Sequence, residues 1–243
     1  MKYKVALIIA ILIIFTTAII ILVNERNNNE KEDSLSDFQN NTIEDNIYKI
    51  DSETYTYTLN GNNVLIKYPV LNSNEMNLSS VNELIKQTAL SGFNEDEEAE
   101  QQIDIDYKIV FYNNEFISIA FTGLANTITA AHPNNIFYTL NIDIKEGTKI
   151  KLTDIYNIDD NFIDTYKSEF KRQINPEIAI YLENYTDEEL KEMFNNADKA
   201  NDGIFSYYTD TTIGISLPTI FAIGNYSKIE INRELLKNNL KQQ

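Results

Sequence analysis

The chain has 243 residues, with 37 acidic and 20 basic side chains, one histidine and no cysteine, so its formal net charge is −17. Without cysteine it has no disulfide, thiol nucleophile or thiolate metal site, and one histidine excludes metal sites that need two or three imidazoles. The strong acidity argues against nucleic-acid binding, which requires a basic face to contact phosphates. The composition therefore predicts neither a cofactor nor a nucleic-acid partner.

The first segment of the chain is predicted to span a membrane. Residues 5–23 are uncharged, and a helix of this length spans roughly 28 Å, close to the hydrocarbon thickness of a bilayer. Lys2 and Lys4 precede it, which places a cytoplasmic tail, 1–4, inside and the rest of the chain outside. A cleaved signal peptide is the alternative, but residues 21–24 offer no small-x-small cleavage site. We expect an uncleaved, single-pass anchor in the cell membrane.

The remainder is predicted to be a stem followed by one extracytoplasmic domain. Residues 24–50 are polar and charged without an apolar period, which is typical of a disordered stem reaching roughly 30 Å. Residues 51–243 contain no repeat and no Pro- or Gly-rich linker. A division of this domain into halves at about 51–157 and 158–243 stays open. With Lys2 and Lys4 inside, 18 basic and 37 acidic residues remain outside, a net charge of −19.

The first half of the domain is predicted to be mainly strands. Tyr55, Tyr57 and Leu59 alternate with threonines before Asn60-Gly61, which predicts a β-hairpin over 54–69. Ser80 and Glu83 form a capping-box pattern for a helix ending near Ser91. An acidic loop, 94–102, follows the helix. Apolar alternation then predicts strands over 103–111, 116–121, 136–144 and 149–152.

The second half mixes helices and strands. An apolar period of 3.6 predicts a helix over 162–174 that ends before Pro176. Thr186 and Glu189 form a second capping-box pattern for the next helix. Strands are predicted over 204–208, 212–217 and 228–231, and a last helix contains Leu235, Leu236 and Leu240. Together these elements predict an α+β fold, with a mainly antiparallel sheet and a few packed helices.

Carboxylate pairs are the only plentiful catalytic groups. They are Asp104/Asp106, Asp159/Asp160 and the acidic run 95–98. Glycoside hydrolysis needs two carboxylates across a cleft, whereas acidic clusters in loops are usually solvated surface, so we do not expect an enzyme. A calcium loop beginning at Asp198 has glycine at the sixth position but lacks the bidentate glutamate at the twelfth. The sequence therefore predicts no metal site.

His132 and the aromatic pairs could each have either a structural or a functional role. His132 lies between two predicted strands, and a lone histidine there is more often a hydrogen-bonded turn residue than a catalyst. Tyr55 with Tyr57, and Tyr207 with Tyr208, fit sheet packing better than a glycan-stacking platform. The alternative of an exposed aromatic platform stays open.

Several segments together resemble a known family. They are Tyr68-Pro69-Val70-Leu71, Phe116-Ile117-Ser118-Ile119, Ala131-His132-Pro133, Tyr138-Thr139-Leu140-Asn141-Ile142-Asp143, Gly147, Leu152-Thr153-Asp154-Ile155-Tyr156, Ile213-Gly214-Ile215, Leu217-Pro218, Ala222-Ile223-Gly224 and Ile229-Glu230-Ile231. Through them residues 54–240 resemble the extracytoplasmic domain of the RsiV family of anti-sigma factors, which are lysozyme sensors, and a related domain that accompanies some peptidoglycan deacetylases. The resemblance implies a non-enzymatic α+β domain that binds a protein or a wall component. It also implies a binding loop made of His132, Pro133, Asn134 and Asn135.

These observations lead to a membrane-anchored extracytoplasmic binding or sensor module. Lysozyme or another cationic wall hydrolase is the expected partner, because a surface of charge −19 attracts a basic protein. Solubility beside an anionic envelope explains the same charge equally well. The alternatives are an accessory module that binds peptidoglycan glycan and a carboxylate-dependent glycan enzyme. Control of a sigma factor does not carry over, because only four residues are expected inside the cell.

Overall fold

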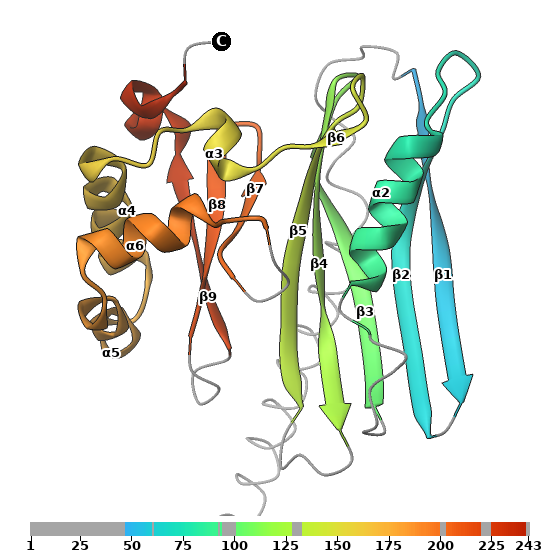
Figure 1. The fold of residues 1–243 in the computed structure, drawn as a ribbon, viewed down its shortest axis with the longest axis horizontal. Helices are drawn as coiled ribbons and strands as arrows, with labels where there is room; N and C mark the ends of the chain where they lie inside the picture. The colour runs from blue at the N-terminus through green and yellow to red at the C-terminus, as the bar shows by residue number, and fades with distance from the viewer. Residues whose placement is uncertain are drawn as a thin grey trace, which may run out of the picture. The chain divides into compact units, whose positions relative to one another are not determined.

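The computed structural model describes residues 47–59, 61–91, 93, 101–127, 133–199, 203–219 and 225–241, and Figure 1 shows their arrangement. All of them belong to one compact unit, which covers residues 46–243. The expected cytoplasmic tail, the anchor and most of the stem lie outside the described residues. Within the described ranges, no helix combines the length and the apolar character needed to cross a membrane.

The larger of two sheets contains six strands in the order β1-β2-β3-β4-β5-β6. Their bounds are β1 Lys49–Leu59, β2 Asn62–Asn72, β3 Gln101–Tyr112, β4 Phe116–Thr127, β5 Asn134–Asp143 and β6 Thr148–Lys149. The predicted first hairpin is confirmed as β1 and β2, and Gly61 turns the chain there with a φ of 83°. Every neighbouring pair is antiparallel except β2 and β3, which run parallel. Helix α2 (Ser79–Leu90) provides the crossover connection that this parallel pair requires.

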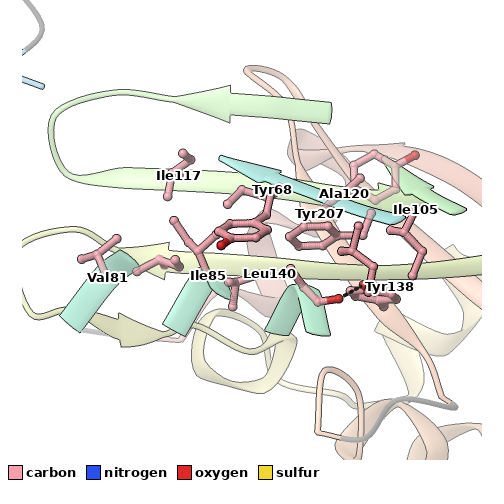
Figure 2. Packing of buried hydrophobic residues seen from close by; sticks show 14 of the residues in the cluster. Tyr68, Val81, Ile85, Ile105, Ile117, Ala120, Tyr138, Leu140 and Tyr207 are labelled. Atoms are coloured by element: carbon pink, nitrogen blue, oxygen red, sulfur yellow. Dashed lines mark hydrogen bonds between the residues drawn. The ribbon is translucent and has the colours of Figure 1, made fainter. Parts of the chain in front are cut away.

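Helix α2 covers one face of the large sheet (Figure 1). Val81, Ile85 and Ala89 recur at helical spacing and enter a buried cluster with the alternating apolar residues of the strands. The rings of Phe121 and Tyr138 stack in this cluster with their centroids 4.9 Å apart. The Tyr138 hydroxyl donates to the carbonyl of Ala89 at 2.5 Å, and Figure 2 marks a hydrogen bond at Tyr138 with a dashed line. The bond satisfies a hydroxyl that burial would otherwise leave unpaired.

The second sheet is smaller and packs with the helices. It contains β7 (Phe205–Tyr208), β8 (Thr212–Pro218) and β9 (Tyr226–Asn232), all antiparallel. The helices are α3 Leu152–Ile155, α4 Asp160–Gln173, α5 Pro176–Ala179, η1 Ile180–Asn184, α6 Asp187–Asn195 and η3 Arg233–Asn239, where η marks a 3-10 helix. Phe162, Tyr166 and Phe170 of α4 are buried in a second apolar cluster with residues of β8 and β9. The structure confirms the α+β class and the predominance of antiparallel pairing.

A buried row of polar side chains joins the two sheets. Thr139 Oγ1 and Asn141 Nδ2 of β5 donate to the carbonyl of Ser206 in β7, at 2.6 and 2.8 Å. Ser118 Oγ of β4 donates to Asn141 Oδ1 at 2.7 Å and accepts from the Tyr208 backbone N–H at 3.0 Å. We call Ser118, Thr139, Asn141 and Ser206 the buried seam. Its directional bonds fix where β7 lies on β4 and β5.

Asp198 extends the buried seam toward the helices. Its Oδ1 accepts from the Ser206 N–H at 2.7 Å, and its Oδ2 accepts from Ser206 Oγ at 2.6 Å and the Leu152 N–H at 2.9 Å. The residue is 1% exposed and adopts a φ of 62°, a left-handed conformation that Asp tolerates better than most residues. One carboxylate therefore ties β7 to the start of α3.

Two predicted boundaries and one helix type are corrected. The domain starts before residue 51, because Tyr48 is 3% exposed and donates its hydroxyl to the Asn113 carbonyl at 2.6 Å. Residues 47–50 therefore belong to the fold and not to the stem. The strand predicted over 149–152 ends at Lys149 because Leu152 begins α3. The last predicted helix is the 3-10 helix η3.

One of the two predicted capping boxes is confirmed. Glu189 N–H donates to Thr186 Oγ1 at 3.2 Å, and Thr186 N–H donates to Glu189 Oε2 at 2.8 Å. The prediction for Ser80 is wrong, because α2 begins one residue earlier and the residue at its N-cap position, Leu78, offers no side-chain acceptor.

These caps give a matched pair of stability predictions. Thr186→Ala removes an acceptor from the first turn of α6, so we expect a loss of about 1 kcal/mol in the free energy of unfolding. Ser80→Ala removes no cap and is expected to change that free energy by less than about 0.5 kcal/mol. Urea unfolding of both variants beside the wild type measures the difference. Equal losses would contradict the assignment of the caps.

Candidate functional site

The predicted binding loop lies at the start of β5. His132 is outside the described residues, whereas Pro133, Asn134 and Asn135 are exposed. Asn225, immediately before β9, donates its Nδ2 to Asn134 Oδ1 at 3.5 Å, so the ends of the two sheets meet here. The structure therefore brings three of the four predicted residues to one exposed edge, next to a strand that the resemblance did not associate with the loop.

A lysine covers two aromatic rings next to this edge. Lys228 Nζ lies 4.7 Å from the ring centroid of Phe137 and 5.5 Å from that of Tyr226, and the two rings are 4.9 Å apart. Loss of hydration lowers the pKa of Lys228, Glu230 opposes this shift, and Lys108 adds to it. Because the ammonium already occupies the ring faces, a sugar could stack there only if Lys228 moved.

The aromatic pairs named from the sequence take part in packing. Tyr207 and Tyr208 are 9% and 3% exposed and belong to the two apolar clusters. Tyr55 and Tyr57 are half-buried against Phe93, with ring centroids 6.4 and 5.2 Å away. The packing interpretation is confirmed for these four tyrosines, and none of them forms an exposed platform.

Three of the carboxylates named from the sequence, Asp159, Asp160 and Asp106, have structural partners. Asp159 caps α4 by accepting from the Phe162 N–H at 3.0 Å and also accepts from Asn239. Asp160 pairs with Lys191 on α6. Asp106 pairs with Lys67 at 2.8 Å on the exposed side of the large sheet. The acidic run 95–98 lies outside the described residues.

Asp198, the first residue of the calcium-loop pattern considered in the sequence, has a structural role. Its two oxygens accept three hydrogen bonds from N–H and O–H donors of Ser206 and Leu152. In the part of the chain that the structure describes, no group of three or more His, Asp or Glu side chains could hold a metal ion. The buried seam was missed because Ser, Thr and Asn in alternating strands usually indicate a solvent face.

The helical side of the domain carries a surplus of negative charge. Residues 157–199 contain 11 acidic and five basic side chains. Most of the basic ones are already paired, in Lys167–Asp187, Lys171–Glu183, Arg172–Glu169 and Lys191–Asp160. The carboxylates of Asp164, Glu177, Glu188 and Glu192 have no hydrogen-bond or ion-pair partner among the described residues. Lys199 is the one basic residue of this range without a carboxylate partner among the described residues, so the unpaired surface charge here is mainly negative.

A groove of about 410 Å³ opens on this negatively charged side. It is lined by Tyr185, Glu189, Glu192, Met193, Asn196, Gly203, Ile204 and Pro218. The floor of the groove is largely apolar, and the carboxylates of Glu189 and Glu192 line its α6 side. The sequence placed α6 correctly but gave no sign of the groove, because the opposite wall comes from the start of β7 and the end of β8.

The fold is similar to that of solved proteins. It matches the crystal structure of a member of the DUF3298 family from Bacteroides fragilis with a TM-score of 0.50 and 15% identity, over 81% of this chain and 95% of that one. A DUF3298 family protein from Pseudomonas aeruginosa matches with a TM-score of 0.48 and 11% identity, over 80% of this chain and 93% of that one. No protein-family model and no curated protein matches the sequence. The first likeness shows the fold, that of a domain of unknown function.

Proposed function

We propose that the domain is a binding module for a cationic protein at the cell envelope, with lysozyme or a similar wall hydrolase as partner. The observation that supports this proposal is the surplus of unpaired carboxylates on the helical side, among them Asp164, Glu177, Glu188 and Glu192. A single-sign surface accelerates encounter with a partner of opposite charge and opposes wrong partners. The resemblance of the sequence to the RsiV domain supports lysozyme in particular.

In this proposal residues 5–23 hold the domain at the outer face of the membrane. The chain then presents its ligand-binding surface to the wall. The predicted loop, of which Pro133, Asn134 and Asn135 are exposed, supplies polar groups at one end of the domain for a partner contact.

A second candidate is an accessory module that binds wall glycan. It is favoured by the exposed amide side chain of Asn134, which accepts from Asn225, the residue that precedes the half-buried Tyr226. An amide group can hydrogen-bond the hydroxyl groups of a sugar. Lys228 over the Tyr226 ring favours an anionic glycan over a neutral one.

Salt dependence separates the two candidates. The full chain in detergent is titrated with lysozyme by calorimetry at about 0.01 M and about 0.15 M salt, where the screening length falls from about 30 to about 8 Å. We expect lysozyme to bind and its affinity to fall on the order of tenfold at the higher salt. α-Lactalbumin, which has the lysozyme fold but an acidic surface, is the control and is expected not to bind.

The remaining outcomes decide against the proposal. Absence of lysozyme binding at either salt concentration, or equal binding of α-lactalbumin, contradicts it. Salt-insensitive pelleting with purified peptidoglycan supports the glycan-binding module instead. Turnover of glycan that is lost on carboxylate substitution would identify an enzyme.

A further inference from the structure

Helix α6 presents two chemically different faces. Leu190, Phe194 and Ala197 are buried in the apolar cluster of the helical side. Glu189, Glu192, Met193 and Asn196 follow one another at spacings of three, one and three residues and therefore share the outer face, which lines the groove.

The two carboxylates on the groove differ in their bonding. Glu189 Oε2 accepts from the Thr186 N–H and hydroxyl, and these bonds hold the pKa of Glu189 below its ordinary value. Glu192 has no side-chain partner among the described residues. Lys199 donates to Asn196 Oδ1 at 3.1 Å and bonds neither carboxylate. Glu192 therefore has its full acceptor capacity available to a ligand.

The apolar part of the groove faces these carboxylates. Met193 is half-buried on α6, Ile204 immediately precedes β7, and Pro218 ends β8. Tyr185 closes the groove at the start of the α6 segment with a half-buried ring. A ligand that fits must therefore combine an aliphatic portion with a positive end.

We propose that this groove holds a lysine or arginine side chain of the protein partner. The aliphatic stem would lie against Met193, Ile204 and Pro218, and the cationic head would reach the carboxylate of Glu192. The face of Tyr185 offers a further attraction for a cation. The groove of about 410 Å³ has room for one long basic side chain and its backbone. This inference rests on the proposed function, because it assigns one contact of the cationic partner.

Methionine NMR tests the groove without the partner protein. The chain contains three methionines, so labelling with [ε-13C]methionine gives three methyl signals, from Met1, Met76 and Met193. Met193 lines the groove, whereas Met76 packs against the other apolar cluster. Trilysine is added to the full chain at low salt. We expect the Met193 signal, assigned with Met193→Leu, to shift saturably while Met76 does not, and triglutamate to shift neither.

Two variants of equal charge control this experiment. Glu192→Lys is expected to weaken the trilysine effect on Met193 at least tenfold, because it places a cation where the ligand cation must lie. Glu146→Lys changes the net charge equally at an exposed turn outside the groove and is expected to change the affinity less than twofold. Equal effects of both variants, or a Met193 signal that trilysine does not shift, would overturn the inference.

The lysozyme titration then distinguishes the two proposals. Lysozyme binding weakened at least tenfold by Glu192→Lys but not by Glu146→Lys supports both. Lysozyme binding that both variants weaken equally supports the proposed function and rejects the groove as the contact. A trilysine response without lysozyme binding supports a site for basic side chains and rejects lysozyme as the partner.

Discussion

Replacing Asp198 with alanine is expected to destabilise the domain by about 2 to 6 kcal/mol. The carboxylate accepts from two buried backbone N–H groups, those of Ser206 and Leu152, and each donor left without a partner costs about 1 to 3 kcal/mol. Alanine also tolerates the φ of 62° less well than aspartate. Chemical unfolding followed by circular dichroism measures the loss.

Asp198→Asn separates hydrogen bonding from charge. Asparagine tolerates the left-handed conformation and keeps one acceptor oxygen, but its NH2 group faces a donor. We therefore expect a smaller loss of about 1 to 3 kcal/mol. Wild-type stability in both variants would show that the carboxylate does not hold the start of α3 on β7.

The same residue makes stability depend on pH. Burial raises the pKa of Asp198 above its ordinary value of 3.8, although hydrogen bonds from Ser206 and Leu152 and the charge of Lys149 oppose the shift. The folded state then binds more protons than the unfolded state between the two pKa values. This contribution to stability is therefore greatest below about pH 3.8 and falls as the pH rises through the folded-state pKa. Relative to wild type, Asp198→Asn is expected to remove this contribution, and an unchanged pH profile would argue against it.

Replacing Gly214 with alanine is expected to cost about 1 to 3 kcal/mol and to lower Tm by roughly 2 to 12 °C. Gly214 lies opposite Tyr207 in β7 and β8, and a Cβ there would lie only 1.9 Å from Cζ of the tyrosine ring. The ring cannot move freely, because its hydroxyl donates to Glu230 at 3.2 Å and its edge packs against Phe137. Differential scanning calorimetry measures the change.

Gly203→Ala is the matched control for this prediction. A Cβ at Gly203 meets no atom within 4 Å, so we expect a change within about 1 kcal/mol, in the stabilising direction. In a Tyr207→Ala background, Gly214→Ala is expected to lose most of its effect. An undiminished effect in that background would show that the ring is not the cause.

Local patterns in the sequence predicted most of the elements. The alternation before and after Gly61 predicted a hairpin, and the Thr186 capping box predicted the start of α6, because both signals depend on residues a few positions apart. The same kind of pattern at Ser80 was wrong, because the helix starts one residue earlier and its N-cap position holds Leu78, a buried side chain that cannot accept a hydrogen bond. Two capping-box patterns of equal strength in the sequence can therefore differ in whether the cap forms in the folded protein.

Contacts between distant residues were beyond such patterns. Asp198 bonds Leu152, which is 46 residues away, and Ser118 bonds Tyr208, which is 90 residues away. The polar residues of β4 and β5 gave no sign that a second sheet covers them. For the candidate site, the sequence identified the exposed residues 133–135, but the groove on α6 required knowledge of which strand ends face the helix.

The parallel pairing of β2 and β3 has a consequence for folding. The β1–β2 hairpin and the β3–β4–β5 meander each join neighbours in the sequence, whereas the Lys67–Asp106 contact across β2 and β3 spans 39 residues. Closing that chain segment costs entropy before the strand pair gains any free energy. The β1–β2 hairpin and the β3–β4–β5 meander are therefore expected to nucleate separately. The pairing of β2 with β3, which α2 connects, is expected to set the rate at which the native protein forms.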